Sequence, residues 1–247
     1  MLIRSKLFEK HHLTAVFSDR LGGVSPAPWD SLNLGLGLGD DALNVQQNLE
    51  RLCVEAAISI PHRAKQVHGV HTLICEGEGV QHDQAADILM TTASACAVAV
   101  RTADCLPILL ADPCCGVVAA VHAGWRGTAE SIVVKAVKKM QQHGARIEQM
   151  VVALGPCIGG CCFEVGVDTA EMLAVTHSHA KQRIRWQGEK AYPDLQAVNR
   201  LQLESLGFTA PQMESISCCT ACHPERFFSW RRDGNQSGRM LAMVALP

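Results

Sequence analysis

The chain has 247 residues, and its 22 Lys and Arg against 24 Asp and Glu leave a formal net charge of −2. This balance argues against nucleic acid or an anionic membrane surface as a partner. Hydrophobic residues make up 48% and charged residues 19%, which excludes a disordered or fibrous protein. Because no linker, charge block or repeat divides the sequence, we expect one domain spanning residues 1–247.

Cysteine and histidine are abundant, with twelve and eleven residues. The cysteine content is nevertheless below the ~8–10% typical of a disulfide scaffold. The first twelve residues lack the apolar core and cleavage site of a secretory signal. The longest apolar stretch, Cys105–Trp125, is interrupted by Asp112 and His122, which disqualifies it as a membrane span. We therefore expect a soluble cytoplasmic protein with reduced thiols, and the sequence carries no signal for a particular oligomeric state.

The N-terminal part of the chain predicts a strand, a long loop and a helix. Alternation of apolar residues predicts the strand over His12–Ser18. The Gly-, Pro- and Asn-rich segment Asp19–Asp40 follows, and a loop of this length in a compact domain is typically functional. Asp40 and Asp41 then precede a helix whose apolar face is formed at helical spacing by Val45, Leu49, Leu52, Cys53 and Ala56.

The middle of the chain consists of short apolar runs separated by Gly, Asp or Pro, which predict buried strands. These runs are Lys65–Val67, Val70–Cys75, Ile88–Met90, Cys96–Val100, Leu106–Leu110 and Val117–Val121. Thr128 is then expected to cap a helix that stops at Gly144. The apolar face of that helix consists of Ile132, Val133, Ala136, Val137 and Met140.

The C-terminal part alternates between further strands and helices. A strand at Met150–Leu154 and a turn at Gly155–Gly160 lead into helices near Val167–Val175 and from Asp194 to Leu206. The last expected strands are Met213–Ser217, Phe227–Trp230 and Met240–Leu246. Because runs of strands outweigh regular strand–helix alternation, the expected class is α+β, with mixed sheets packed against helices.

Three potential metal ligands stand at the ends of predicted strands. They are His68 in Gln66–Gly69, Cys105 in Ala103–Pro107, and His122 in Val121–Gly127. One cysteine and two histidines make three ligands, and three protein ligands with an open position are typical of catalytic zinc. Their sequence separations are too long for a zinc finger, so only the fold can bring them together.

Each of these residues also has an ordinary structural interpretation. Cys105 fits a buried thiol, His122 a core histidine bonded to the backbone, and His68 a surface turn residue. Arg101, Asp104 and Arg126 place charges around them that an inert core would avoid. These charges favour the functional interpretation.

Several segments occur in an order that resembles the laccase-domain family. They are Phe17–Ser25, Ser31–Leu34, Gln66–Gly69, Arg101–Cys105, His122–Gly127, Gly155–Gly159 and Arg231–Gly234. Members of this family are also called polyphenol oxidases, purine nucleoside phosphorylases of the laccase-domain type and, in bacteria, peptidoglycan editing factors. The resemblance runs from about Phe17 to Met240. Trp230 and Ala221 depart from the family pattern, which has Tyr at both places.

The resemblance implies that His68, Cys105 and His122 are zinc ligands, with copper as an alternative metal. It further implies phosphate-dependent cleavage of adenosine, inosine and S-methyl-5′-thioadenosine, with adenosine deamination as a second activity. The implied partners are therefore a small nucleoside and phosphate. Zinc in an open site lowers the pKa of a bound water to about 7, which suits deamination, whereas phosphorolysis needs cationic or N–H donors for the phosphate.

Three polar residues are candidate substrate or phosphate contacts. Arg20 stands in a Gly-rich loop beside Gly22 and Gly23, with Asn33 as a polar partner, and Arg126 follows the His122 motif. A solvated loop arginine is the ordinary interpretation of Arg20.

Three other functions remain open. The first is an amidase acting on a peptidoglycan precursor, either with zinc or with Cys105 as nucleophile and His122 as base. The second is a copper-dependent phenol oxidase, which the single His177-Ser178-His179 pair disfavours. The third is a zinc-stabilised binding module without activity.

The remaining cysteines near glycines carry weaker signals. Cys157, Cys161 and Cys162 suggest a second metal site, but adjacent cysteines do not easily aim at one ion, so turn packing is favoured. Cys219 and Cys222 have redox spacing without a thioredoxin-like βαβ context, and we interpret them as a surface disulfide or an inert pair.

Overall fold

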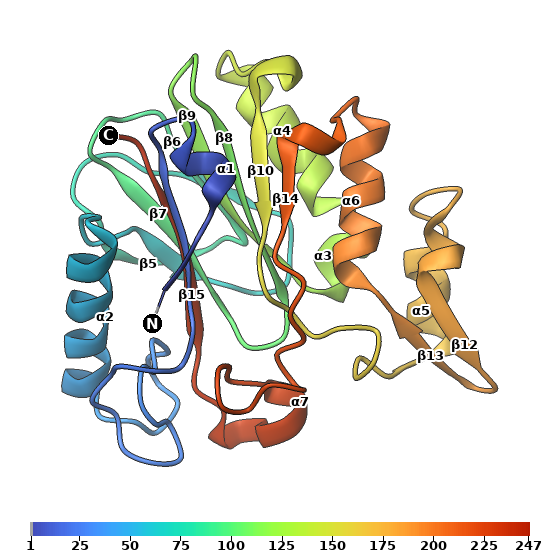
Figure 1. Ribbon diagram of the computed structural model, residues 1–247, viewed down its shortest axis with the longest axis horizontal. Coiled ribbons are helices and arrows are strands. Elements are labelled where there is room, and N and C mark those ends of the chain that lie inside the picture. The colour runs from blue at the N-terminus through green and yellow to red at the C-terminus, as the bar shows by residue number, and fades with distance from the viewer. Residues whose placement is uncertain (1) are drawn as a thin grey trace.

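Two β-sheets pack face to face at the centre of the computed structural model, which describes residues 2–247 (Figure 1). One sheet has six strands in the order β14-β10-β8-β9-β6-β4. Its strands are β4 Thr72–Ile74, β6 Ile88–Thr91, β8 Leu106–Asp112, β9 Val117–Ala123, β10 Val151–Leu154 and β14 Met213–Ser215. The other is antiparallel throughout, with order β1-β2-β15-β7. Its strands are β1 Leu2–Arg4, β2 Thr14–Ser18, β7 Ala97–Thr102 and β15 Met240–Ala245.

The strands β8 and β9 are buried along their whole length, and for this reason their sequences are nearly continuous apolar runs. Successive side chains point to opposite faces of a strand. Ile108 and Leu110 of β8 thus join the core under the helices, whereas Leu109 and Ala111 join the core between the two sheets.

Helices cover the outer face of each sheet (Figure 1). Helix α2 (Ala42–Ala56) lies on the four-stranded sheet, and Asp41 caps it by accepting a hydrogen bond from Leu43 N. Helices α3 (Trp125–Ala129), α4 (Ile132–Gln142) and α6 (Leu195–Ser205) pack on the six-stranded sheet. The expected apolar faces of α2 and α4 are both buried, and the α+β class is confirmed.

Smaller elements complete the fold. Strands β3 (Arg63–Lys65) and β5 (Gln81–Ala85) pair in parallel. Strands β11 (Val165–Gly166), β12 (Ile184–Gln187) and β13 (Lys190–Pro193) form a sheet beside α5 (Val167–Ala174), at the right edge of Figure 1. The short helices are α1 (Lys6–Glu9) and α7 (Trp230–Asp233).

Two expectations about local structure were wrong. Phe227–Trp230 is not a strand, because Ser229 instead caps α7 by accepting a hydrogen bond from Arg232 N, and Phe227 and Phe228 are buried without pairing in a sheet. Thr128 does not cap the long helix: it lies buried within α3, where its hydroxyl accepts a hydrogen bond from Asn199 of α6. Ser229 also donates a hydrogen bond to Asp104 at 3.0 Å, so in both segments a contact with a distant part of the chain accompanies the departure from the local pattern.

None of the helices in residues 2–247 is both long and apolar enough to cross a membrane.

Candidate metal centre

The structure brings His68, Cys105 and His122 together, and we call these three residues the metal centre. Their ligand atoms all lie within 4.8 Å of one another. His68 follows β3, Cys105 lies in the turn before β8, and His122 is the penultimate residue of β9. The expected positions at strand exits hold only loosely, because Cys105 enters a strand and His122 lies within one. Pro107 of β8 pairs with His122 of β9 in antiparallel register, and this pairing places Cys105, two residues before Pro107, near His122.

Gly124 leaves the space in which the ligands converge. A Cβ atom at this position would lie 2.9 Å from His68 Nδ1 and 3.1 Å from Cys105 Sγ. The backbone φ of Gly124 is −73°, so its conformation would tolerate any residue. Close approach of the ligands, rather than backbone geometry, therefore requires glycine here.

Asp87, which the sequence analysis missed, ties two of the ligands together. Its carboxylate is fully buried and accepts a 2.7 Å hydrogen bond from His122 Nδ1. It also accepts bonds from the backbone N–H groups of Val67, His68 and Gly69, at 3.1, 3.0 and 2.8 Å. A carboxylate behind a ligating imidazole fixes the ring and leaves the other nitrogen free to bind a metal. The only sequence signal was an acid directly before a buried strand.

The charges of the centre suit a metal. Burial raises the pKa of the Cys105 thiol, but His122 and His68 outweigh burial and lower that pKa to about 6. Burial lowers the pKa of His122, whereas Cys105 and Asp87 raise it to about 9. Cys105 and His122 thus favour a thiolate–imidazolium pair at neutral pH. The thiolate is the form that binds metal ions, and a bound ion would displace the second proton of His122. The donor set of one thiolate and two imidazoles, with a carboxylate behind one of them, fits zinc.

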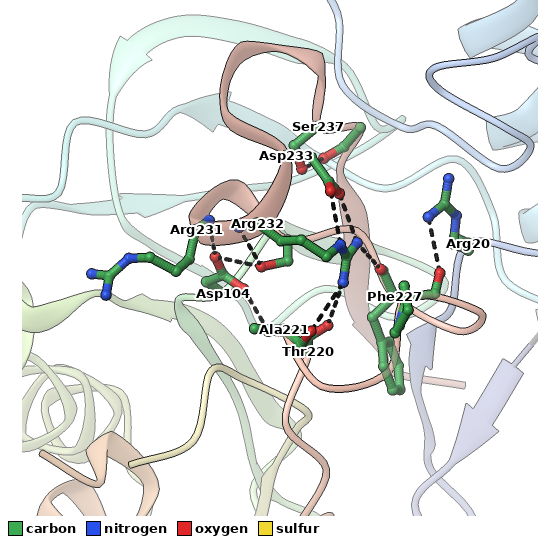
Figure 2. A network of polar contacts seen from close by, with 12 residues as sticks. Arg20, Asp104, Thr220, Ala221, Phe227, Arg231, Arg232, Asp233 and Ser237 are labelled. Carbon is green, nitrogen blue, oxygen red and sulfur yellow. Dashed lines mark hydrogen bonds and ion pairs between the residues drawn. The ribbon is translucent and has the colours of Figure 1, made fainter. Parts of the chain in front are cut away.

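Asp104, the neighbour of Cys105, faces away from the imidazoles. Figure 2 shows its carboxylate between Thr220 and Arg231. It accepts hydrogen bonds from Thr220 Oγ1, Ser229 Oγ and Arg231 N, at 2.6, 3.0 and 2.6 Å. The φ angle of Asp104 is +89°, an unusual value for a residue other than glycine. These contacts hold the Cys105 turn against the C-terminal segment.

The metal centre opens into a cavity of about 770 Å³. Basic and apolar groups share its walls. The basic residues are Lys65, Arg101, Arg126, Arg231 and Arg239. The apolar residues are Leu36, Leu38, Trp125, Ile158, Phe163, Val165 and Trp230. Such a cavity has room for an aromatic base and donors for an anion.

Arg101 and Arg239 make the cavity attractive to an anion. Burial lowers the pKa of both guanidinium groups, and Arg63 and Arg239 lower that of Arg101 further. Arg101 donates to Ala64 O, and Arg239 donates to Ser237 O and Gly238 O. Among residues 2–247, neither forms an ion pair with a carboxylate within 4.0 Å. Cys105 and Asp104 raise the pKa of Arg239 without outweighing burial, so these cations are only partly compensated and favour a bound anion.

The three candidate substrate contacts lie in different places. Arg126 lines the cavity, with its guanidinium 4.5 Å from the centre of the Trp125 ring. Arg20 is not among the lining residues, because it bonds to Asp30 and Pro224 O and stacks on Phe228. Asn33 is fully buried behind the wall.

Asn33 nevertheless supports the cavity. Its Oδ1 accepts hydrogen bonds from Gly35 N and Arg239 N, at 3.0 and 2.9 Å. Both of these neighbours line the cavity. Asn33 therefore positions the wall instead of contacting a substrate directly.

Fold and site together define a class of protein: an α+β chain in which two histidines and a cysteine that could hold a metal ion face a cavity rich in arginine. The chain belongs to the family described as multi-copper polyphenol oxidoreductase laccase, which matches residues 14–247.

Similar proteins span nearly the same length. A purine nucleoside phosphorylase of Deinococcus radiodurans is 36% identical over 94% of this chain and 88% of its own length. The purine nucleoside phosphorylase YfiH of Escherichia coli is 36% identical over 95% of this chain and 94% of its own length. The crystal structure of the Bacillus licheniformis hypothetical protein YfiH superimposes with a TM-score of 0.90 at 27% identity, covering 97% of this chain and 94% of that one.

Proposed function

We propose that this chain is a zinc-dependent purine nucleoside phosphorylase that cleaves adenosine, inosine and S-methyl-5′-thioadenosine, with adenosine deamination as a second activity. One observation carries the proposal: the metal centre and the arginines Arg101, Arg126 and Arg239 face the same cavity. The names of the relatives in Deinococcus radiodurans and Escherichia coli support it. The partners are then a small nucleoside and phosphate, with no role for nucleic acid.

The chain's own residues divide the work. Arg101 and Arg239 hold the phosphate, since fixed N–H donors place it against the anomeric carbon without reorganisation during the reaction. Phe163, Ile158 and Trp230 provide an apolar wall for the base. The phosphate attacks the anomeric carbon as the bond to the purine nitrogen breaks, and the purine leaves with the bonding electrons.

The metal centre supports the departing purine. His68, Cys105 and His122 would hold zinc, and Asp87 keeps the His122 Nδ1 proton in place so that Nε2 is available as a ligand. When bound, zinc supplies a Lewis acid that stabilises negative charge developing in either reaction. Copper is the alternative metal, because thiolate and imidazole ligands also suit it.

The proposal is tested by incubating metal-loaded protein with each nucleoside, with and without inorganic phosphate. We expect adenine or hypoxanthine to appear only with phosphate, and inosine to appear from adenosine without it. Absence of free base from all three nucleosides in phosphate would overturn the proposal. Replacing Arg101 by Gln should raise KM for phosphate by about tenfold and spare deamination, whereas Arg51→Gln on the exposed side of α2 should change neither.

A thiol amidase acting on a peptidoglycan precursor is the second candidate, and one observation favours it. Asp87 orients His122, and His122 in turn neighbours Cys105, so the three could act as nucleophile, base and orienting acid. Cys105 would attack the amide carbonyl, and His122 would pass the thiol proton to the leaving amine. An acyl adduct on Cys105, seen by mass spectrometry in zinc-free protein, would favour this function over phosphorolysis.

We further propose that the protein works in the cytoplasm. All twelve cysteines are free thiols, and a reducing compartment keeps them so.

A further inference from the structure

Four cysteine side chains from two separate loops meet beside the cavity. Cys161 and Cys162 lie between β10 and β11, and Cys219 and Cys222 lie between β14 and α7. The four Sγ atoms lie within 4.8 Å of one another, and we call these residues the four-cysteine cluster. None of them belongs to the metal centre. The two adjacent cysteines do converge, contrary to the expectation from their positions in the sequence.

The spacing of the sulfur atoms matches a tetrahedral thiolate site. Zinc binds thiolates at about 2.3 Å, so neighbouring sulfurs around one ion lie about 3.8 Å apart. Cys222 Sγ is 3.6 Å from Cys161 Sγ and 3.3 Å from Cys162 Sγ. A disulfide would bring two sulfurs to about 2.05 Å, and all four cysteines are free thiols.

The surrounding backbone independently favours bound thiolates. Gly159 N donates a 3.2 Å hydrogen bond to Cys219 Sγ, as expected for a sulfur that carries negative charge. A Cβ on Gly159 would lie 3.3 Å from Cys161 Sγ and 3.7 Å from Cys219 Sγ, so the glycine leaves room for the sulfurs. The two loops also pair directly, because Thr220 N donates to Cys157 O at 3.1 Å.

We propose that Cys161, Cys162, Cys219 and Cys222 bind a zinc ion that cross-links the two loops. Four protein ligands close the coordination sphere, so the site is structural and carries no reaction. The bound thiols release their protons to solvent, and the ion replaces them. This inference goes beyond the proposed function, since it concerns a second ion and its measurement does not depend on turnover.

The cross-link stabilises one wall of the cavity. Phe163 lines the cavity directly after Cys162, and Arg231 donates to Cys162 O at 3.2 Å. Thr220, which lies between Cys219 and Cys222 in the chain, donates a hydrogen bond to the carboxylate of Asp104 (Figure 2), the residue that precedes Cys105. The ion would therefore keep the apolar wall and the Cys105 turn in register.

The test counts zinc in protein purified under reducing conditions without chelator. We expect the Cys161→Ser/Cys222→Ser variant to contain about one zinc ion fewer per chain than the unchanged protein. Cys114→Ser/Cys115→Ser, an exposed adjacent pair elsewhere in the chain, is the matched control and should lose none. His68→Ala/His122→Ala should lose the ion of the metal centre alone. Equal zinc content in the Cys161/Cys222 variant and the unchanged protein would overturn the proposal.

A second measurement does not require the cysteine variant to fold. Cobalt added to the His68→Ala/His122→Ala protein, after its zinc has been removed with a chelator under reducing conditions, should produce a strong thiolate-to-cobalt charge-transfer absorption from the intact four-cysteine cluster. Its absence would overturn the proposal. So would an intact mass, measured without reductant, that lacks two hydrogens because two of the four cysteines have formed a disulfide.

Discussion

The metal centre and the four-cysteine cluster use similar donor atoms in opposite settings. The centre has three candidate ligands on or beside strands, Cys105 and His122 at β8 and β9 of the six-stranded sheet and His68 after β3, with the buried Asp87 behind them and a cavity in front. The cluster has four ligands on loops, and two of its side chains are exposed. Ligand number and placement thus separate an open site suited to chemistry from a closed site suited to holding loops together.

The sharpest way to break this comparison is to remove a ligand of the centre. Cys105→Ala should lower phosphate-dependent base release by more than about a hundredfold, since altering even an outer partner of a metal ligand costs 10- to 100-fold. The fold should survive, because β8 and β9 are held by their own pairing and by side chains buried along their whole length. Activity assays with circular dichroism check this, and global unfolding would instead make the centre structural.

The pKa of each thiol should separate the two regions in metal-free protein. The Cys105 pKa is lowered to about 6, so the thiolate prevails at pH 7 and is lost as pH falls through 6. Burial and the neighbouring thiols Cys219 and Cys222 raise the Cys161 pKa to about 11. Iodoacetamide should therefore modify Cys105 about 30- to 100-fold faster at pH 7, because its larger thiolate fraction outweighs the weaker nucleophilicity of a thiolate of low pKa. Peptide mass spectrometry over pH 5–9 measures this, and a midpoint near 9 for Cys105 would contradict it.

Gly124 tests whether the centre depends on close approach of its ligands. Gly124→Ala should weaken zinc binding by about 10- to 100-fold, because the new methyl group meets His68 Nδ1 and Cys105 Sγ. Gly166→Ala, where a Cβ meets nothing within 4 Å, is the control for zinc affinity. Titration with a competing chelator measures both, and unchanged affinity in Gly124→Ala would show that the ligands can spread.

Asp87→Asn should weaken zinc binding by about tenfold. An amide still accepts a proton from His122, but its NH₂ group faces backbone N–H donors that the carboxylate had satisfied. The same chelator titration measures the loss, with Asp83→Asn on the exposed side of β5 as control. Equal zinc affinities of the Asp87→Asn and Asp83→Asn variants would show that Asp87 does not support zinc binding.

The smallest expected effect on activity comes from the four-cysteine cluster. Cys161→Ser/Cys222→Ser should lower Tm by at least about 4 °C, which corresponds to about 1–2 kcal/mol for a chain of this size. Activity at 25 °C should fall less than tenfold, because these residues shape the wall without touching the reacting atoms. Calorimetry measures the change in Tm. If activity fell as far as in Cys105→Ala, the four-cysteine cluster would contribute to the reaction as much as the metal centre does.

Local pattern was a good guide where elements are long and buried. The apolar face of α2 and the runs of β8 and β9 are present as expected, because burial imposes a period that sequence displays directly. The short strands β11, β12 and β13 were not predicted, because they are partly exposed and their sequences carry no such period. The predictions of a strand over Phe227–Trp230 and of a cap at Thr128 were wrong because the hydroxyls of Ser229 and Thr128 bond to residues elsewhere in the chain, Asp104 and Asn199.

The sequence by itself determined the α+β class and the buried strands, because burial imposes a period on residue type. It also singled out His68, Cys105 and His122 as candidate ligands by residue type and by the Gly or Asp near each, and the structure brings these three side chains together. Only the tertiary structure decided that Asp87 stands behind His122 and that the four cysteines converge. The structure also shows that Arg101 and Arg239 line the cavity, whereas Arg20 stacks on Phe228 and does not line it. These relations join residues far apart in the chain, and their contacts depend on strand register and loop path, which leave no periodic trace in sequence.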